Sequence, residues 1–406
     1  MLLYEALDKS SRIYHDKIAL SCENQKISYV ELKGRVDTFA SGLRIANIHP
    51  GMRVGLLLHN SIDFVVCLYG LAKNGNVISL LNTQMSLEGL ENKLDTHKLD
   101  IIISENYFYN LIVNSKSFLA KKYKFILRKS HENKELSIED VLKQGTSKHT
   151  NIDNATSLDD NIIIQSSSGT TGVSKSGYRT HRNLFIDTNN IITTFKYSFD
   201  DIIYCVAPFC HGFGLTMGLL SPIYCGAMIH IERWFMANRF FSIYEEVKPT
   251  IFLGIPEDYD SMTKYVGDSS FTFAYRKWFL CSGSPLSEEV GLQFNKKFDV
   301  WINQVYGMME VSTISANLES DKDNFLSVGK PVSNVNVRIG NTSTSADHGE
   351  SGEIFVKSET LSREYIESGK SVELQTTDGW FGTKDIGRKD QDGNIHIICR
   401  KELQAD

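Results

Sequence analysis

A stretch rich in small polar residues occupies positions 166–177, with the sequence SSSGTTGVSKSG. Hydroxyl and backbone N–H groups donate hydrogen bonds to phosphate oxygens, and Lys175 adds a positive charge. The small side chains let the backbone close around an anion. The apolar segment NIIIQ, residues 161–165, leads directly into the stretch and has the character of a buried strand. The sequence therefore predicts a loop that holds a polyphosphate, in preference to a flexible Gly/Ser linker.

A Walker A loop is the other phosphate-binding pattern that this stretch approaches. The Walker pattern has a glycine directly before its lysine, whereas Ser174 stands at that position. Gly177 follows where a Walker loop would enter a helix that donates its N-terminal amides to phosphate. No hydrophobic strand ending in aspartate supplies an obvious Walker B partner. These departures weigh against the Walker interpretation.

Seven segments in a fixed order resemble motifs of the AMP-forming adenylating enzymes, which include acyl- and aryl-CoA synthetases, peptide-synthetase adenylation domains and luciferases. The phosphate loop is similar to the pattern [ST]SGTTGxPKG of that family. The N-terminal segment ISYVELKGRVDTFASGL is similar to the family's TYxEL helix. The other matching segments are THRNL (180–184), PFCHGFGL (208–215), CSGSPLSEE (281–289), QVYGMMEVS (304–312) and DGWFGTKDIGRKDQDGNIHIICRK (378–401). The resemblance covers the chain from end to end and is greatest to an acyl-CoA synthetase.

The resemblance implies an AMP-forming acid–CoA ligase. Such an enzyme joins a carboxylate to the α-phosphate of ATP, releases pyrophosphate and leaves an acyl-adenylate, from which CoA normally takes the acyl group. Because the reacting groups are anionic, the site must neutralise charge and align them. ATP and AMP, Mg²⁺, CoA and a small carboxylic acid are the expected ligands. Two alternatives stay open: an adenylating enzyme that loads a carrier protein, and a degenerate, non-catalytic nucleotide- or acyl-binding module.

The motif matches also imply roles for individual residues. The phosphate loop would hold the β- and γ-phosphates, with Thr170 and Lys175 as catalytic residues. Glu310 would be catalytic and would help to bind Mg²⁺, an ion that prefers hard oxygen ligands. Tyr306 would stack on adenine, and Asp385 would accept hydrogen bonds from the ribose hydroxyls. The other expected nucleotide-binding residues are Ser167, Ser168, Gly169, Thr171, Gly172, Gly283, Ser284, Gly307 and Arg400.

His211 lies in the segment that lines the acyl channel in the family, so we expect it near the substrate. An ordinary core histidine is the alternative. Peptide-synthetase domains usually place an aspartate nearby to pair with the substrate's amino group, and residues 208–218 contain none. Since burying an unpaired amino group is costly, a fatty or aryl acid is expected rather than an amino acid.

Four positions depart from the family pattern. Ser174 replaces a proline and Ser176 a glycine in the phosphate loop, and Lys384 replaces the glycine before Asp385. Met309 replaces a threonine whose hydroxyl lies near the phosphates in the family. Because a thioether cannot donate a hydrogen bond, we expect Met309 to slow or alter adenylation.

Alternating helix and strand patterns predict an α/β fold with two helix-flanked, mostly parallel sheets and a small β-rich part. Ser28 and Glu31 have the spacing of a capping box that starts a helix. We expect a first α/β subdomain over 1–155, a second one with the phosphate loop over 156–325, and a β-rich subdomain over 326–399. Residues 400–406 would begin the hinge to a C-terminal domain that the sequence lacks. In the family that domain carries a lysine that completes adenylation, so weak or no turnover is expected of this chain alone.

The composition limits the function classes. With 41% hydrophobic and 23% charged residues, the chain is typical of soluble globular proteins, and its net charge of −6 argues against a nucleic-acid partner. The seven cysteines include no CxxC pair, which favours reduced thiols in a cytoplasmic protein. The apolar segment 202–231 contains two prolines and several glycines. This pattern favours buried strands and a helix over a membrane span.

Overall fold

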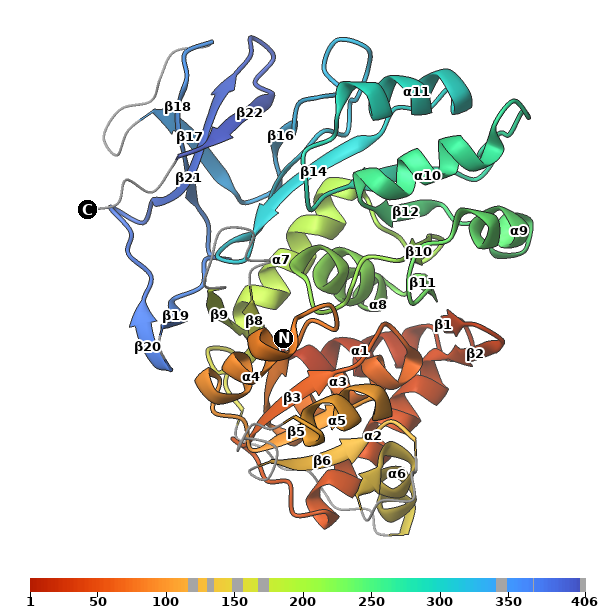
Figure 1. The fold of residues 1–406 in the computed structure, drawn as a ribbon, viewed down its shortest axis with the longest axis vertical. Coiled ribbons are helices and arrows are strands. Elements are labelled where there is room, and N and C mark those ends of the chain that lie inside the picture. Colours follow the sequence, from red (N-terminus) through yellow and green to blue (C-terminus); the bar gives the residue numbers. More distant parts are fainter. Residues whose placement is uncertain are drawn as a thin grey trace.

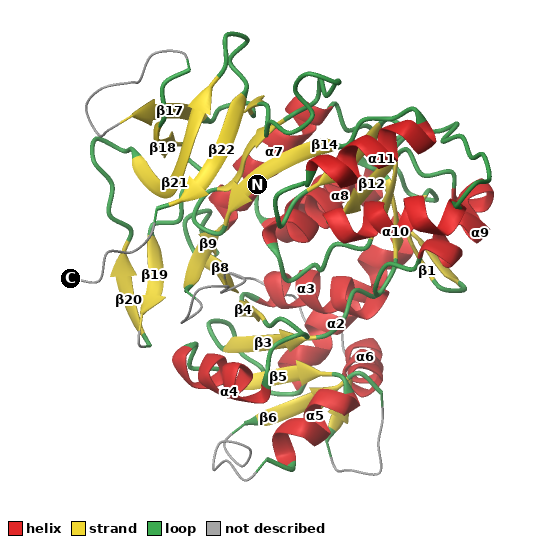
Figure 2. Cartoon of the chain, turned by 45° about the horizontal axis from the view of Figure 1, so that its top comes forward, coloured by secondary structure: helices red, strands yellow, loops and turns green. Residues whose placement is uncertain are grey.

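The computed structural model describes residues 1–115, 123–129, 135–147, 156–166, 175–340, 349–367 and 369–401. Within these residues the chain forms two nine-stranded sheets and one four-stranded sheet (Figure 1, Figure 2). In Figure 1 the first large sheet lies in the lower half, and the small sheet lies at the upper left. The predicted α/β fold, with two helix-flanked, mostly parallel sheets and a small β-rich part, is confirmed.

The first large sheet contains the strand that leads into the predicted phosphate loop. Its strands from β8 to β7 run parallel, whereas β9 and the β19–β20 hairpin are antiparallel. In order across the sheet the strands are β20 (Lys370–Glu373), β19 (Glu364–Glu367), β9 (Ser176–Thr180), β8 (Asn161–Ser166), β4 (Val77–Leu80), β3 (Arg53–Leu57), β5 (Ile101–Ser104), β6 (Lys124–Leu127) and β7 (Leu136–Ser137).

The second large sheet is parallel in its centre and antiparallel at both edges. In order it contains β16 (Lys330–Pro331), β15 (Ser312–Ala316), β14 (Asn303–Met308), β13 (Trp278–Cys281), β12 (Ile251–Gly254), β10 (Ile202–Cys205), β11 (Met228–Ile231), β1 (Ile18–Cys22) and β2 (Gln25–Ser28). The small sheet is antiparallel and contains β17 (Asn336–Gly340), β18 (Gly352–Lys357), β21 (Phe381–Lys389) and β22 (Ile395–Arg400).

Helices cover the large sheets and fill the space between them (Figure 1). Helices α1, α7 and α8 pack against one another at this junction, and α2 packs against α3 and α6. The helices are α1 (Leu3–Ile13), α2 (Tyr29–Ile45), α3 (Ile62–Asn74), α4 (Leu87–Thr96), α5 (Asn106–Val113), α6 (Ile138–Ser147), α7 (His181–Phe195), the π-helix η2 (Phe213–Leu220), α8 (Ser221–Cys225), α9 (Ala237–Val247), α10 (Pro256–Val266) and α11 (Glu288–Phe298).

Local sequence explains why these elements form where they do. The capping box predicted at the start of α2 is present: the Glu31 backbone N–H donates to Ser28 Oγ at 3.3 Å, and the Ser28 N–H donates to Glu31 Oε2 at 2.7 Å. Every residue of β5 is buried, as expected of a parallel strand covered on both faces. Thr180 caps α7 by accepting a hydrogen bond from the Asn183 N–H, so the THRNL segment does begin a helix.

The sheets do not follow the subdomain boundaries expected near residues 155 and 325, and that division stays a prediction. Strand β1, from the first predicted subdomain, pairs with β11 in the second large sheet. Strands β8 and β9, from the second predicted subdomain, complete the first large sheet. The β19–β20 hairpin, from the β-rich part, joins β9 in that same sheet. These long-range pairings bring distant segments of the chain to the end of β9.

The apolar segment 202–231 forms β10, η2, α8 and β11 inside the protein. None of the described helices is long and apolar enough to cross a membrane. The sequence interpretation of this segment as buried strands and a helix is therefore confirmed.

Candidate active site

Several expected site residues meet where the two large sheets and the small sheet approach one another. The Ser362 N–H donates to the Glu310 carbonyl at 2.7 Å, which joins the β14–β15 turn to the segment before β19. The Tyr306 hydroxyl joins β14 to Asp385 on β21. Figure 1 shows β9, β14 and β21 converging in this region. The junction joins residues of two motif segments, QVYGMMEVS (304–312) and DGWFGTKDIGRKDQDGNIHIICRK (378–401).

Lys175 and Glu310 belong to the same electrostatic environment. Lys175 Nζ lies 5.3 Å from the centroid of the Tyr365 ring. Burial raises the pKa of the Glu310 carboxyl above its usual value; the positive charges of Lys175 and Arg400 oppose this rise, and the negative charge of Asp385 adds to it. A buried carboxylate can bind a metal ion, because the positive charge of the metal favours the ionised form that burial disfavours.

Most of the predicted phosphate loop lies outside the described residues. This applies to Ser167, Ser168, Gly169, Thr170, Thr171 and Gly172. Both ends of the loop are described: Ser166 ends β8, and Lys175 directly precedes β9. The last paired residues of the hairpin are Ser166 and Ser176, so the loop leaves from the carboxyl end of a parallel strand. Ligands of open α/β sheets usually bind beyond such strand ends.

The expected ribose site is built from β14, β21 and β22. The Tyr306 hydroxyl donates to Asp385 Oδ2 at 2.5 Å, and Arg400 Nη1 lies 3.7 Å from Asp385 Oδ1. Asp385 and Arg400 are cross-strand partners. Tyr306 is only 8% exposed, and its burial, together with the Asp385 carboxylate, raises the pKa of its hydroxyl. One oxygen of Asp385 is therefore already engaged by the protein, while both carboxylate oxygens retain lone pairs that can accept further hydrogen bonds.

Glycines shape the turns around this site. A Cβ at Gly307 would collide with the backbone oxygen of Ser312, so β14 and β15 can approach only because residue 307 has no side chain. Gly283 has φ +96°, a conformation that favours glycine, and lies with Ser284 in the exposed turn after β13. Since β13 pairs with β14, this turn lies one strand away from Tyr306.

His211 lies two residues before the start of η2, and its ring contacts a residue that the sequence analysis did not single out. The Asn82 amide Nδ2 lies 3.3 Å from His211 Nε2. Burial lowers the pKa of His211, so the ring is neutral at pH 7. An amide nitrogen can only donate, so Nε2 accepts and Nδ1 carries the proton. The following helix is of the π type, a form that is frequent at functional sites.

Two of the departures from the family pattern have clear surroundings. Met309 packs against the beginning of β9: a Cβ built at Gly177 would lie 3.4 Å from its Cε. Its carbonyl oxygen accepts a hydrogen bond of 3.5 Å from Arg179. Lys384 has φ +65°, the left-handed conformation in which glycine is favoured, and its side chain is exposed.

A buried polar group behind the site was missed by the sequence analysis. Asp187 on α7 is fully buried, and the Ser312 hydroxyl donates to its Oδ2. Burial raises the pKa of Asp187, and the nearby Arg179 cation opposes the rise. A signal was present, because helical spacing places Asp187 on the same face as the buried Leu184 and Ile191.

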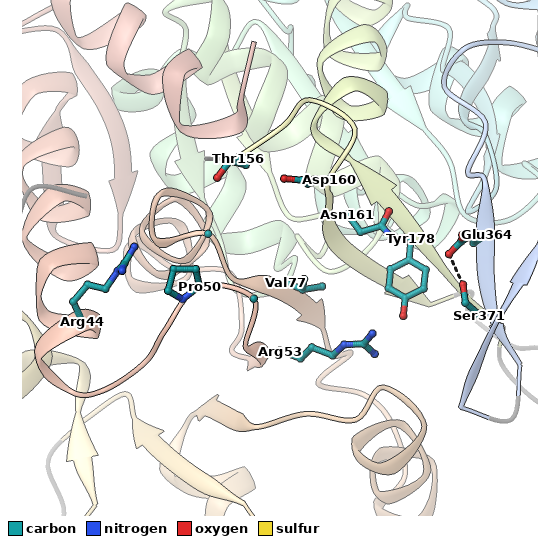
Figure 3. Close-up of a pocket in the computed structure, with 12 residues that line it drawn as sticks. Arg44, Pro50, Arg53, Val77, Thr156, Asp160, Asn161, Tyr178, Glu364 and Ser371 are labelled. Atoms are coloured by element: carbon teal, nitrogen blue, oxygen red, sulfur yellow. Dashed lines mark hydrogen bonds between the residues drawn. The ribbon is translucent and has the colours of Figure 1, made fainter. Parts of the chain in front are cut away.

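A cavity of 680 Å³ lies at the opposite end of the first large sheet (Figure 3). It is lined by residues at the amino ends of β3, β4 and β8, among them Arg53, Val77 and Asn161, and by Tyr178 and Glu364. Figure 3 shows Arg53 extending toward Tyr178 across this space. Because the predicted phosphate loop leaves the carboxyl end of β8, this cavity is separate from the predicted nucleotide site.

Comparisons with known proteins identify the family. The model of the AMP-binding enzyme family matches residues 7–366, and the chain belongs to this family. Feruloyl-CoA synthase from Amycolatopsis sp is 24% identical over 377 residues, which cover 92% of this chain and 73% of that protein. The long-chain-fatty-acid–CoA ligase of Bacillus subtilis (strain 168) is 24% identical over 430 residues, covering 98% of this chain and 77% of the ligase.

The fold agrees with solved structures of similar proteins. The crystal structure of the anthranilate CoA ligase AuaEII in complex with anthranoyl-AMP superposes with a TM-score of 0.89 at 21% identity, covering 98% of this chain and 78% of that one. At this identity the comparison supports the fold alone. Together with the family match, it confirms the resemblance inferred from the motifs.

Proposed function

We propose that the protein activates a carboxylic acid with ATP to an acyl-adenylate and then forms a thioester with CoA. The observation that carries the proposal is the convergence of Lys175, Glu310, Tyr306 and Asp385 at one junction, in a chain of the AMP-binding enzyme family. These side chains come from segments far apart in the sequence. Their types match the parts of ATP that such a reaction must hold: phosphates, metal, base and sugar.

Lys175 and Glu310 form the proposed phosphate end of the site. Lys175 supplies a positive charge for the phosphates, beside the loop residues Ser167 to Gly172, including the proposed catalytic Thr170. Glu310 would help to hold Mg²⁺, which in nucleotide sites usually binds through one or two carboxylates together with the phosphates. The desolvated state of the Glu310 carboxyl fits this role, because a nearby cation compensates the burial of its charge. When bound, the metal neutralises charge that develops on the phosphates.

Tyr306, Asp385 and Arg400 form the proposed nucleoside end. The hydrogen bond from Tyr306 fixes the Asp385 carboxylate on β21, which leaves acceptor capacity for two ribose hydroxyls. The Tyr306 ring is proposed to contact adenine over the turn that contains Gly283 and Ser284. Arg400 Nη1 lies 3.7 Å from the Asp385 carboxylate and would add a positive charge near the sugar.

The proposed acid site lies next to His211 and Asn82. A neutral His211 keeps a charge out of this partly buried segment. No aspartate in residues 208–218 could pair with an amino group, so a fatty or aryl acid is the proposed substrate class. The names of the two relatives above, a feruloyl-CoA synthase and a long-chain-fatty-acid–CoA ligase, agree with this class.

A second candidate function is a nucleotide- or acyl-binding module without catalysis. Met309 favours it, because a methionine at this turn cannot donate a hydrogen bond to phosphate. The test is a panel of fatty, aryl and amino acids, with acid-dependent pyrophosphate release measured in the presence and absence of CoA. CoA-dependent AMP formation with a fatty or aryl acid supports the ligase. Pyrophosphate exchange that never responds to CoA favours carrier-protein loading, and ATP binding without any exchange favours the binding module.

A further inference from the structure

A buried polar cluster on α4 contacts the beginning of β9, next to the proposed phosphate site. Lys93 Nζ donates to Ser176 Oγ at 2.8 Å, and His97 Nε2 lies 2.8 Å from the same oxygen. Ser166 Oγ lies 2.9 Å from Ser176 Oγ, and Ser79 Oγ lies 2.7 Å from His97 Nδ1. We call these five residues the Lys93 cluster. Ser166 and Ser176 flank the loop residues to which a role in phosphate binding is assigned, and Ser176 is one of the positions that depart from the family pattern.

The cluster contains a buried lysine, and lysine is rarely buried in proteins. Lys93 is only 6% exposed, and its burial lowers the pKa of the ammonium group to about 8, so the group remains mostly charged at pH 7. A buried charge is costly unless polar partners compensate for the lost water, and Ser176 is such a partner. The Ser176 hydroxyl therefore has a specific task that the glycine usual in the family could not perform.

His97 completes the network as a neutral ring. Burial and the nearby cations Lys93 and Arg53 lower its pKa to about 3. A neutral imidazole carries one N–H, so one of the two serines at its ring nitrogens accepts a hydrogen bond and the other donates one. Satisfied polar networks of this kind hold their members in one arrangement.

The network fixes a position that adjoins Lys175. Ser176 is held by Lys93 on α4 and by His97 directly after that helix. It is also held by Ser166 on β8 and by β19, where it pairs with Ile366. Lys175 is the preceding residue, and its ammonium group lies over the ring of Tyr365, the neighbour of Ile366. The backbone of Lys175 is therefore anchored on the side of the chain that enters β9.

We propose that Lys93, acting through Ser176, is a positioning residue that holds Lys175 in place for the outer phosphates of ATP. The inference rests on the proposed function, in which Lys175 contacts these phosphates. Lys93 itself contacts no substrate. Removal of Lys93 leaves Ser176 without its charged donor, so Lys175 must be ordered by the ligand at the moment of binding.

The test compares two nucleotides that differ only in the phosphates concerned. ATP with magnesium and AMP are titrated by calorimetry into the 406-residue chain and into Lys93→Met and Ser176→Ala. We expect the Kd for ATP to rise about tenfold in each variant and the Kd for AMP to stay within about twofold. The effects of the two changes should not add in the double variant, because both break the same contact. The matched control is Lys98→Met, which removes an exposed lysine just beyond the same helix.

Each outcome decides between explanations. An equal loss of ATP and AMP affinity means that Lys93 only supports the fold, and unchanged ATP affinity means that it does not position Lys175; either result overturns the inference. If Lys93→Met does not fold, as judged by its thermal melt, the same two outcomes for Ser176→Ala decide. A wild-type chain that binds neither nucleotide contradicts the proposed function itself, and the inference falls with it.

Discussion

The hydrogen bond between Tyr306 and Asp385 allows the proposed ribose site to be tested by removing one oxygen atom. In Tyr306→Phe the ring remains in place at its buried position, and only the 2.5 Å hydrogen bond to Asp385 Oδ2 is lost. A hydrogen bond to a charged group contributes about 1.5–3 kcal/mol. The side chain of Asp385 is 11% exposed and lies 3.7 Å from Arg400, so water and the arginine compensate in part. We therefore place the loss at about 1.5 kcal/mol.

This loss sets the expected change in nucleotide affinity. If the Tyr306 hydroxyl orients Asp385 for the ribose, the binding of AMP to the variant must itself order the Asp385 side chain. The Kd for AMP should therefore rise up to about tenfold, which corresponds to about 1.4 kcal/mol. Calorimetric titration with AMP measures the change. Tyr29→Phe is the matched control, because the Tyr29 hydroxyl is also buried but donates to the Ala227 carbonyl at 2.7 Å, on another part of the fold. Equal AMP affinity in Tyr306→Phe and Tyr29→Phe would refute the reasoning.

Three further predictions concern the turn beside Glu310 and the stability of the fold. Met309→Thr should raise acid-dependent pyrophosphate exchange, because a hydroxyl can donate to phosphate; an unchanged exchange rate rejects this role. Gly307→Ala should lower the free energy of unfolding by about 1–3 kcal/mol, because its Cβ would collide with the Ser312 backbone. Gly34→Ala, on the exposed face of α2, should raise the free energy of unfolding by about 0.5–1 kcal/mol. Chemical denaturation measures both values, and the opposite ranking of the two variants contradicts the packing. Burial lowers the pKa of His181 to about 4, so the stability that its neutral ring provides is present above pH 6.5 and is lost as the pH falls toward 4. His181→Gln should therefore flatten the pH dependence of the melting temperature between pH 6.5 and 4. An unaltered profile in the variant would contradict this role of His181.

Much of the fold was predictable because its signals are local. The apolar runs that form β3, β5 and β8 are each bounded by polar residues. The start of α2 is indicated by the spacing of Ser28 and Glu31, which form its capping box. The exchange of strands between the sheets was not predictable, because it depends on pairing between distant segments. Leu20 pairs with Ile229, and nothing in either short strand specifies the other as its partner.

Some residues of the candidate site were also predictable from the sequence, and others were not. Motif order pointed to Lys175, Glu310, Tyr306 and Asp385, and the structure brings them to one junction. Lys93 was overlooked because a lysine on a polar helix is usually a surface residue, whereas here its burial and its contact with Ser176 distinguish it. Such buried polar residues break the hydrophobic pattern that sequence reasoning relies on, so they emerge only when the partners of each side chain are known.

The most direct test of the central claim is a crystal structure of the protein with ATP and magnesium. The account predicts phosphates beside Lys175, the metal ion at the Glu310 carboxylate, and the nucleoside between Tyr306 and Asp385. A nucleotide bound elsewhere, for example in the cavity near Arg53, or a Glu310 side chain turned away from the metal, would contradict it.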